Sequence, residues 1–177
     1  MLAAVVLAAG ASSRFGSPKQ RLLLPAVLER VGAAGLDEIV VVLGAHDVAH
    51  LACRSVRCPD WERGPGASLR CGLRVLDPET EAAVVVLADG PELSPAAVRR
   101  VVAAWREQPA SVVAASYDGA RSHPLVLGRD AWDDVPDEGL RAYEPLLVPC
   151  DDLGSPGDVD YPGDLPERFR NIGDEPM

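Results

Sequence analysis

Lysine is almost absent from this chain of 177 residues. Of its 17 basic residues, 16 are arginine, and the only lysine is Lys19. Basic residues are also outnumbered, because 27 acidic residues give a net charge of −10 and a pI near 4.7. Nucleic acids and anionic membranes attract proteins through a positive field, so this balance argues against both partners. The excess of negative charge is concentrated in residues 130–177, which hold 14 acidic and three basic side chains. An anion-binding site is therefore expected within residues 1–129.

Long hydrophobic runs are missing as well. No apolar stretch approaches the roughly 20 residues that a membrane span requires. The first apolar run, Leu2–Leu7, follows only Met1, whereas a signal peptide has a basic start and a longer apolar region. We therefore expect a cytoplasmic protein.

The usual spacings of metal-binding cysteines and histidines are absent too. The four cysteines form neither a C-x-x-C pair nor a zinc-type double pair, and the three histidines do not form a cluster. His46 and His50 share a face of a short helix expected over Asp47–Ala52, without the glutamate of an H-E-x-x-H motif. We expect surface histidines, and free thiols of a reducing compartment. The cysteines are Cys53, Cys58, Cys71 and Cys150.

What the sequence does contain is an alternation of apolar strands and helices. Nearly continuous β-branched runs predict strands that are buried on both faces. Ser94-Pro95 opens the clearest helix, with an N-cap serine and a proline in the first turn, and shorter helices are expected over Val27–Ala34 and Ala67–Leu76. The predicted strands are Leu2–Leu7, Glu38–Leu43, Ala82–Leu87 and Ser111–Ala115.

This alternation predicts the fold class. Strands joined by helices imply right-handed crossovers and a mostly parallel sheet. We predict an α/β protein, a single three-layer αβα, Rossmann-like domain over residues 1–177, on which the acidic Pro/Gly-rich tail 151–177 packs. Ligands of such sheets bind beyond the carboxyl ends of the strands.

The loop after the first strand has the composition of an anion site. Small residues before Arg14 let the backbone approach a ligand, and consecutive N–H groups there can form an anion-binding nest. Arg14 and Lys19 add two cations, a combination that suits a triphosphate. The spacing is not G-x-x-x-x-G-K-[ST], because five residues separate Gly10 from Gly16, and not G-x-G-x-x-G, because Ala8 stands two before Gly10.

A candidate carboxylate lies at the end of another predicted strand, Ala82–Leu87. Asp89 follows this strand and precedes a proline turn, a position that suits a functional carboxylate but is also ordinary in turns. Mg²⁺ takes one or two carboxylates together with phosphate oxygens. Beside a triphosphate loop, Asp89 is therefore a candidate metal ligand.

The glycine-containing loop also resembles a family signature. Leu7–Lys19 reads L-A-A-G-x-S-x-R-x-G-x-x-K, which is similar to the signature of MobA-like nucleotidyltransferases. With alanine at position 9, this segment is most similar to the molybdenum cofactor cytidylyltransferase branch of the family. Four later segments resemble further family motifs in the same order: Gly64–Leu73 (G-x-x-x-S-L-x-x-G-L), Leu87–Pro91 (A-D-Q-P), Ser122–Val126 (G-H-P-V) and Asp158–Leu165 (D-I-D-T-P-E-D-L).

The resemblance implies a fold of the nucleotide-diphospho-sugar transferase type and a Mg²⁺-dependent reaction. A nucleoside triphosphate, expected to be CTP, would react with a phosphate-bearing acceptor such as molybdopterin and release pyrophosphate. Arg14 and Lys19 are then the catalytic residues that hold the triphosphate. Asp89 and Asp160 are the metal ligands, with the neighbouring Asp158 and Asp164 as the alternatives to Asp160.

The same resemblance assigns the remaining contacts. His123 is expected on the acceptor side, or else is a partly buried histidine at a strand edge. A molybdoenzyme is an implied partner. The nucleotide is expected to contact Leu7, Ala8, Ala9, Gly10, Ser12, Ser13, Gly66 and Ser68, the last of which is otherwise a helix cap.

Several positions depart from the family pattern. The segment between Lys19 and the expected helix at Val27 is shorter than is usual in the family. Gly90 stands where Gln or Met is usual, and Ser122 replaces Gly. Two alternatives follow: a nucleotide-binding accessory protein with little catalysis, and an NAD(P)-dependent oxidoreductase, against which the missing G-x-G-x-x-G counts.

Overall fold

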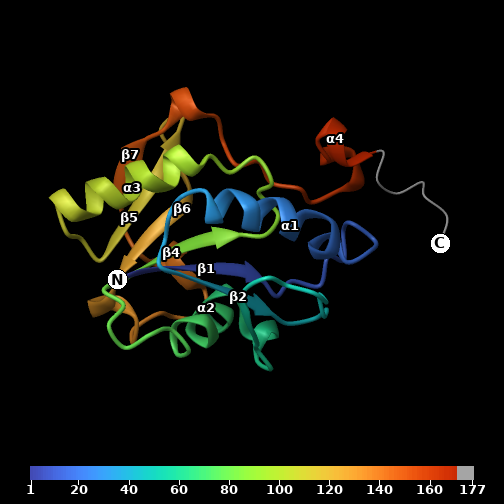
Figure 1. Ribbon diagram of the computed structural model, residues 1–177, viewed down its shortest axis with the longest axis horizontal. Helices are drawn as coiled ribbons and strands as arrows, with labels where there is room; N and C mark the ends of the chain where they lie inside the picture. The colour runs from blue at the N-terminus through green and yellow to red at the C-terminus, as the bar shows by residue number, and fades with distance from the viewer. Residues whose placement is uncertain (171–177) are drawn as a thin grey trace.

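The computed structural model describes residues 1–170, in which seven strands form one sheet in the order β3-β2-β1-β4-β6-β5-β7 (Figure 1). The strands are β1 (Leu2–Ala8), β2 (Glu38–Leu43), β3 (Arg54–Arg57), β4 (Ala82–Leu87), β5 (Val112–Tyr117), β6 (Ala120–Gly128) and β7 (Leu146–Pro149). The helices are α1 (Lys19–Gly32), α2 (Pro65–Leu73), α3 (Pro95–Glu107) and α4 (Glu167–Arg170). Short 3₁₀ turns are η1 (Trp61–Arg63), η2 (Arg129–Ala131), η3 (Gly139–Ala142), η4 (Asp151–Leu153) and η5 (Pro162–Asp164).

The sheet is mixed and mostly parallel, which confirms the predicted class. Strands β1, β2, β3 and β4 pair in parallel, and β7 pairs in parallel with β5. Strand β6 is antiparallel to both β4 and β5. The chain reverses direction in a tight turn between β5 and β6. Asp118 and Gly119 of this turn both have positive φ, as two-residue hairpin turns commonly require.

Helices cover both faces of the sheet, as expected of a three-layer αβα fold. Figure 1 shows α1 and α3 on one face and α2 on the other. Val6, Val41 and Val84 pack with α1 and α3, whereas their neighbours Val5, Val42 and Val85 pack with α2. Because the central strands are buried on both faces, their side chains are apolar throughout, and this is the reason that they could be predicted from continuous apolar runs.

Two helices differ from the expected ranges, and one is absent. Helix α1 begins at Lys19 rather than Val27 and contains Pro25 in its interior. Helix α2 covers Pro65–Leu73. The helix expected over Asp47–Ala52 was wrong, because this segment is irregular. His50 has a φ of 59°, in the left-handed region that an α-helix excludes, so His46 and His50 do not share a helix face.

The chain after β7 returns along α1. Val159, Leu165 and Phe169 pack on Leu23 of that helix and are buried. This contact lays residues 156–160 beside the carboxyl end of β4, where the Val159 N–H donates to the Asp89 carbonyl. Residues 171–177 of the predicted tail lie outside the described part of the chain. Within residues 1–170, no helix combines the length and apolar character that crossing a membrane would take.

Candidate active site

Three adjoining cavities lie at the carboxyl ends of β1 and β4, and Leu7 lines all of them. We call them the loop cavity (about 290 Å³), the Trp61 cavity (about 320 Å³) and the His123 cavity (about 390 Å³). Asp89 lines both the loop cavity and the Trp61 cavity. The position agrees with the general rule that ligands of such sheets bind beyond the carboxyl ends of the strands.

The loop after β1 is held open by its own hydrogen bonds. The Ser12 hydroxyl donates to the Gln20 side chain at 2.7 Å, and Gln20 donates to the Gly10 carbonyl at 2.7 Å. Ser12 has a φ of 54°, and the Phe15 N–H closes a turn on its carbonyl. Within residues 1–170, the backbone N–H groups of residues 10–13 donate to no protein acceptor. Consecutive free N–H groups of this kind can bind an anion.

The loop cavity combines these donors with two cations and two carboxylates. Arg14 and Lys19 line it together with Asp89 and Asp160. The Arg14 guanidinium lies 2.9 Å from the Asp160 carboxylate. Other residues of the same cavity are Leu7, Ala8, Gly10, Ser12, Ser13, Gln20 and Ala88, so most of the residues predicted for nucleotide binding come together here.

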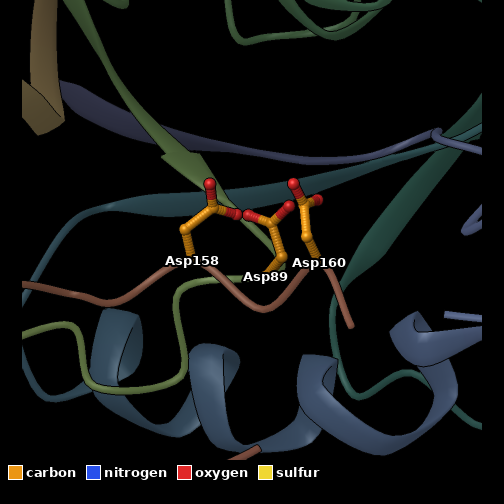
Figure 2. A group of neighbouring side chains, drawn as sticks. All are labelled: Asp89, Asp158 and Asp160. Atoms are coloured by element: carbon orange, nitrogen blue, oxygen red, sulfur yellow. The ribbon is translucent and has the colours of Figure 1, made fainter. Parts of the chain in front are cut away.

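Three carboxylates gather beside this cavity. Asp89 at the end of β4, together with Asp158 and Asp160 from the returning segment, presents ligand oxygens within 4.8 Å of one another (Figure 2). Burial, followed by the charges of Asp89 and Asp160, raises the pKa of Asp158 above its ordinary value. The Asp89 Oδ1 atom is buried and has no hydrogen-bond partner within residues 1–170. A divalent cation with oxygen ligands fits this group, because it would satisfy Oδ1 and offset the repulsion.

The Trp61 cavity lies between the loop and α2. Its wall includes Ala9, Gly64 and Ser68, as well as the indole ring. Gly44 beneath the ring has to be a glycine, because a Cβ there would lie 2.7 Å from the Trp61 ring and 2.6 Å from the Ala9 carbonyl. Ser68 is buried inside α2 rather than capping it, since the helix begins at Pro65.

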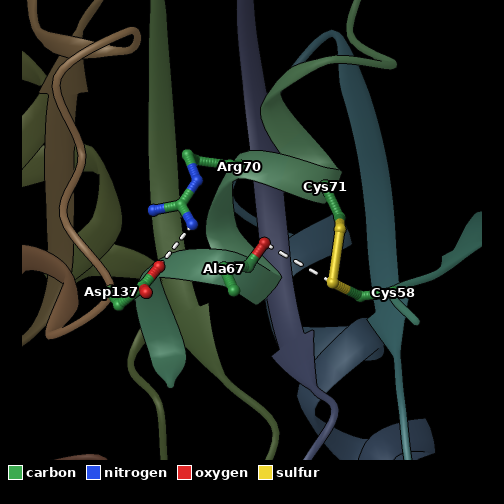
Figure 3. The surroundings of a disulfide bond; sticks show 5 residues. All are labelled: Cys58, Ala67, Arg70, Cys71 and Asp137. Atoms are coloured by element: carbon green, nitrogen blue, oxygen red, sulfur yellow. Dashed lines mark hydrogen bonds and ion pairs between the residues drawn. A yellow bond between two sulfur atoms is a disulfide. The ribbon is translucent and has the colours of Figure 1, made fainter. Parts of the chain in front are cut away.

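Gly66 does not face any of the three cavities. Its N–H donates to the Asp137 carbonyl at 2.9 Å, and a Cβ on it would lie 1.7 Å from the Pro136 carbonyl. Gly66 thus allows residues 136–139 to approach α2. Arg70 of α2 stabilises the same contact by an ion pair with Asp137 (Figure 3). The hydrogen bond from the Arg70 guanidinium is the main cause of the lowered pKa of Asp137.

A disulfide bond joins Cys58 to Cys71, with Cα atoms 5.7 Å apart (Figure 3). The expectation that all cysteines are free was therefore wrong, and it holds only for Cys53 and Cys150. The pair forms because α2 packs over β2, and this brings Cys71 to the segment that follows β3. The closed loop of residues 58–71 contains Trp61 and Gly64, so the bond fixes a wall of the Trp61 cavity.

His123 lines the third cavity with Arg121 and Arg141. Burial, and then the charges of these two arginines, lowers the pKa of His123 to about 4, so its imidazole is neutral at pH 7. Asp158 lies at the border between this cavity and the carboxylate cluster. The structure therefore places His123 next to the other candidate residues and not on a separate surface.

Two residues of the site were not among the sequence candidates, and a third was only an alternative. Gln20 follows Lys19 directly and supports the loop, but its neighbours gave no sign that it turns back to Gly10. Trp61 precedes the Gly64 motif by one turn, and an indole beside a glycine-rich helix start was the available signal. Asp158 was considered only as an alternative to Asp160, whereas the structure groups both with Asp89.

Comparison with known proteins gives one family and many similar folds. A family model described as the MobA-like NTP transferase domain matches residues 4–143. The structure of Rv0371c from Mycobacterium tuberculosis is 26% identical with a TM-score of 0.76, and the match covers 92% of this chain and 94% of that one. The same protein in complex with manganese is 24% identical with a TM-score of 0.71 and covers 92% and 95%.

More distant structures share the fold. A CMP:2-keto-3-deoxy-manno-octonic acid synthetase complexed with CTP is 15% identical with a TM-score of 0.68, and the match covers 92% of this chain and 94% of that one. The molybdopterin-guanine dinucleotide biosynthesis protein A of Archaeoglobus fulgidus is 15% identical with a TM-score of 0.69, covering 96% and 97%. No curated protein sequence matches the chain.

Proposed function

The chain belongs to the MobA-like NTP transferase family, and on this premise we propose that it transfers a nucleotidyl group from CTP to a phosphate-bearing acceptor in the presence of Mg²⁺. An oxygen of the acceptor phosphate bonds to the α-phosphorus. The bond from that phosphorus to the α–β bridging oxygen breaks, and pyrophosphate leaves with this oxygen. The observation that carries the proposal is the loop cavity, in which free N–H groups, two cations and the carboxylate cluster converge.

The free N–H groups of residues 10–13 and the side chains of Arg14 and Lys19 bind the triphosphate. Phosphoryl transfer of this kind needs little covalent help from the protein, so positioning and charge neutralisation supply the rate enhancement. Arg14 and Lys19 neutralise the charge that develops on the leaving pyrophosphate.

Asp89, Asp158 and Asp160 would hold Mg²⁺, and the related Rv0371c has been crystallised with manganese, which prefers similar oxygen ligands. When bound, the cation supplies charge neutralisation at the phosphates and orients them. The orphaned Oδ1 of Asp89 supports this assignment.

The Trp61 cavity is the proposed place of the nucleobase. It adjoins the loop cavity at Gly10 and Asp89, so a nucleotide can occupy both cavities at once. Ala9 and Ser68 offer backbone and hydroxyl groups there, and the resemblance of Ala9 to the cytidylyltransferase branch favours cytosine. A similarly folded synthetase has been crystallised with CTP.

The acceptor is proposed to occupy the His123 cavity, and molybdopterin is the candidate that the family suggests. A relative of the same fold is named for molybdopterin-guanine dinucleotide biosynthesis. A molybdoenzyme that receives the nucleotidylated product would then be a partner.

A nucleotide-binding accessory protein remains the second candidate. It is favoured by α1, which starts at Lys19 and leaves no room for the longer segment that is usual in the family. Family membership favours either of these two functions over an oxidoreductase.

The test is pyrophosphate release from CTP, GTP, ATP and UTP with Mg²⁺ or Mn²⁺, with and without molybdopterin. Thermal shifts with each nucleotide measure binding in parallel, because a ligand of the native state raises Tm. We expect release with CTP and molybdopterin, and its loss in Lys19→Ala but not in Arg21→Ala, an exposed neighbour outside the cavity. Binding of CTP without release would support the accessory protein, and no response to any nucleotide would refute both.

A further inference from the structure

The His123 cavity has an apolar floor and a cationic rim. Its floor consists of side chains from β1, α2, β4 and β6, among them Leu7, Leu69 and Leu125. Its rim carries the guanidinium groups of Arg121 and Arg141. We propose that this cavity selects an acceptor with an apolar, ring-sized body over a sugar phosphate, and that Arg121 and Arg141 bind the acceptor's phosphate.

The inference rests on the proposed function only in taking this cavity as the acceptor's place. The cavity's volume, about 390 Å³, lies within the usual range for small-molecule sites. It holds one small molecule beside the nucleotide.

The charges of the two guanidinium groups are not neutralised by ion pairs with carboxylates of residues 1–170. Neither Arg121 nor Arg141 forms an ion pair with a carboxylate of residues 1–170, whereas Arg14, Arg63 and Arg70 near the other cavities each do. Two exposed carboxylates line the same cavity, those of Glu138 and Asp158, and Asp158 belongs to the carboxylate cluster. In a chain of net charge −10, an unpaired cationic pair at a cavity indicates an anionic ligand.

Arg121 is also fixed in direction. Its Nη1 donates to the Leu140 carbonyl at 3.1 Å and to the Tyr143 carbonyl at 2.8 Å. These two bonds anchor the partly buried side chain and leave its other N–H groups available. Neutral His123 on the same strand adds a hydrogen-bonding ring without adding charge. A preorganised guanidinium of this kind suits the geometry of a phosphate.

The strand register places this rim next to the reaction. Val85 of β4 pairs with Leu125 of β6 in antiparallel fashion, so residues 121–123 run alongside the carboxyl end of β4 that leads to Asp89. Asp158 is shared between the cavity and the carboxylate cluster. A phosphate bound by Arg121 therefore lies close to the α-phosphate, and the guanidinium groups reduce the repulsion between the two anions as they approach.

The apolar floor decides the nature of the acceptor's body. A sugar would place several hydroxyl groups against leucine side chains, which cannot form hydrogen bonds, and each buried unpaired hydroxyl has a cost. A flat or apolar ring loses nothing there and gains from burial. The leucine part of the lining thus offers no hydrogen-bond partner to a polyol or sugar acceptor.

The experiment compares three probes of different chemistry: phenyl phosphate, glucose 1-phosphate and inorganic phosphate. Binding is measured by calorimetry, and the place of binding by the NMR signals of the His123 ring. We expect phenyl phosphate to bind at least about tenfold more tightly than glucose 1-phosphate and to shift the His123 signals.

Three variants locate the anion site. Arg141→Gln removes an exposed side chain and should weaken phenyl phosphate binding about tenfold without affecting folding. Arg121→Lys keeps the charge but loses the paired N–H donors of the guanidinium group. It should weaken phenyl phosphate binding less than Arg121→Gln does. Arg106→Gln, on an exposed position of α3 away from all three cavities, is the matched control and should have no effect.

The outcomes separate this inference from the proposed function. Equal binding of glucose 1-phosphate, or phenyl phosphate binding that is unaffected by Arg141→Gln, would overturn the inference. Binding of CTP with Mn²⁺ is measured on the same samples. Its loss alongside normal phenyl phosphate binding would count against the proposed function and leave the anion site standing.

Discussion

The ammonium group of Lys19 lies 3.2 Å from the Asp89 carboxylate and 3.6 Å from that of Asp160. It also donates to the Val159 carbonyl. The side chain is 11% exposed, so its charge is poorly screened by water. Lys19 thus pairs with two of the three carboxylates that are proposed to hold the metal, and a triphosphate would offer it an alternative partner.

The first prediction concerns competition between Lys19 and a metal. Lys19→Met should bind Mn²⁺ alone about tenfold more tightly than the native protein, because a positive charge next to the metal is removed. The same variant should bind CTP with Mn²⁺ more weakly, since a phosphate ligand is lost. Mn²⁺ titration followed by electron paramagnetic resonance checks both effects. Lys19→Arg, which keeps the charge, is the control, and unchanged metal affinity in Lys19→Met would contradict the prediction.

The second prediction separates the members of the carboxylate cluster from a neighbouring acidic residue. Asp89→Asn should reduce nucleotidyl transfer by at least about 100-fold, because Asp89 supplies the most enclosed oxygen of the carboxylate cluster. Asp158→Asn should also impair metal binding, although less, because its side chain is more exposed.

Asp164→Asn serves as the control for these two variants. Its carboxylate accepts the Tyr161 N–H at 2.8 Å and so holds the turn after Asp160 without joining the cluster. Mn²⁺ affinity measured by calorimetry should fall for Asp89→Asn and Asp158→Asn only. A loss in Asp164→Asn as large as that in Asp158→Asn would show that the assignment of ligands is incorrect.

The third prediction concerns the bond between Cys58 and Cys71. A disulfide that closes a loop of 13 residues stabilises the native state by about 3 kcal/mol in the chain-entropy model. Reduction with dithiothreitol should therefore lower Tm and weaken CTP binding, since residues 58–71 form a wall of the Trp61 cavity. Denaturation curves and calorimetry under both conditions measure these changes.

The double variant Cys58→Ser, Cys71→Ser is the control for this effect. Its Tm should be insensitive to dithiothreitol and should match that of the reduced native protein. Mass spectrometry after alkylation should find Cys53 and Cys150 free. Four alkylated cysteines in the unreduced protein would contradict the prediction.

Sequence reasoning succeeded where a single physical constraint decides the structure. Strands β1, β2 and β4 are buried on both faces, so their apolar runs were sufficient to predict them. The edge strand Arg54–Arg57 is exposed on most of its residues and has no such run, so it was missed. The loop before Lys19 was predicted as an anion site because such a site needs small residues and cations close together in sequence, and this stays a prediction.

The parts that failed depend on contacts between distant segments. The carboxylate of Asp158 reaches the carboxylate cluster because residues 159–169 pack on α1, and no local pattern encodes that packing. Cys58 meets Cys71 because α2 lies over the sheet, and neither residue's neighbours indicate a pair. The segment near His50, which was expected to be helical, instead contacts β3, where Asp47 pairs with Arg57.

The fourth prediction uses the pH dependence of His123. Its pKa is lowered to about 4 in the native protein, mainly by burial, whereas in the unfolded chain it should be near the ordinary value of 6.5. The unfolded state therefore binds a proton first as the pH falls, so His123 contributes full stability above pH 6.5 and loses it between 6.5 and 4. His123→Gln lacks this titration. As the pH falls through that interval, the variant should therefore lose about 1–3 kcal/mol less of its free energy of unfolding than the native protein loses. Urea denaturation at pH 7.5 and pH 4.5 provides the comparison, and other titrating groups cancel because both proteins share them. Equal losses in the two proteins would show that His123 titrates normally and that its ring is open to water.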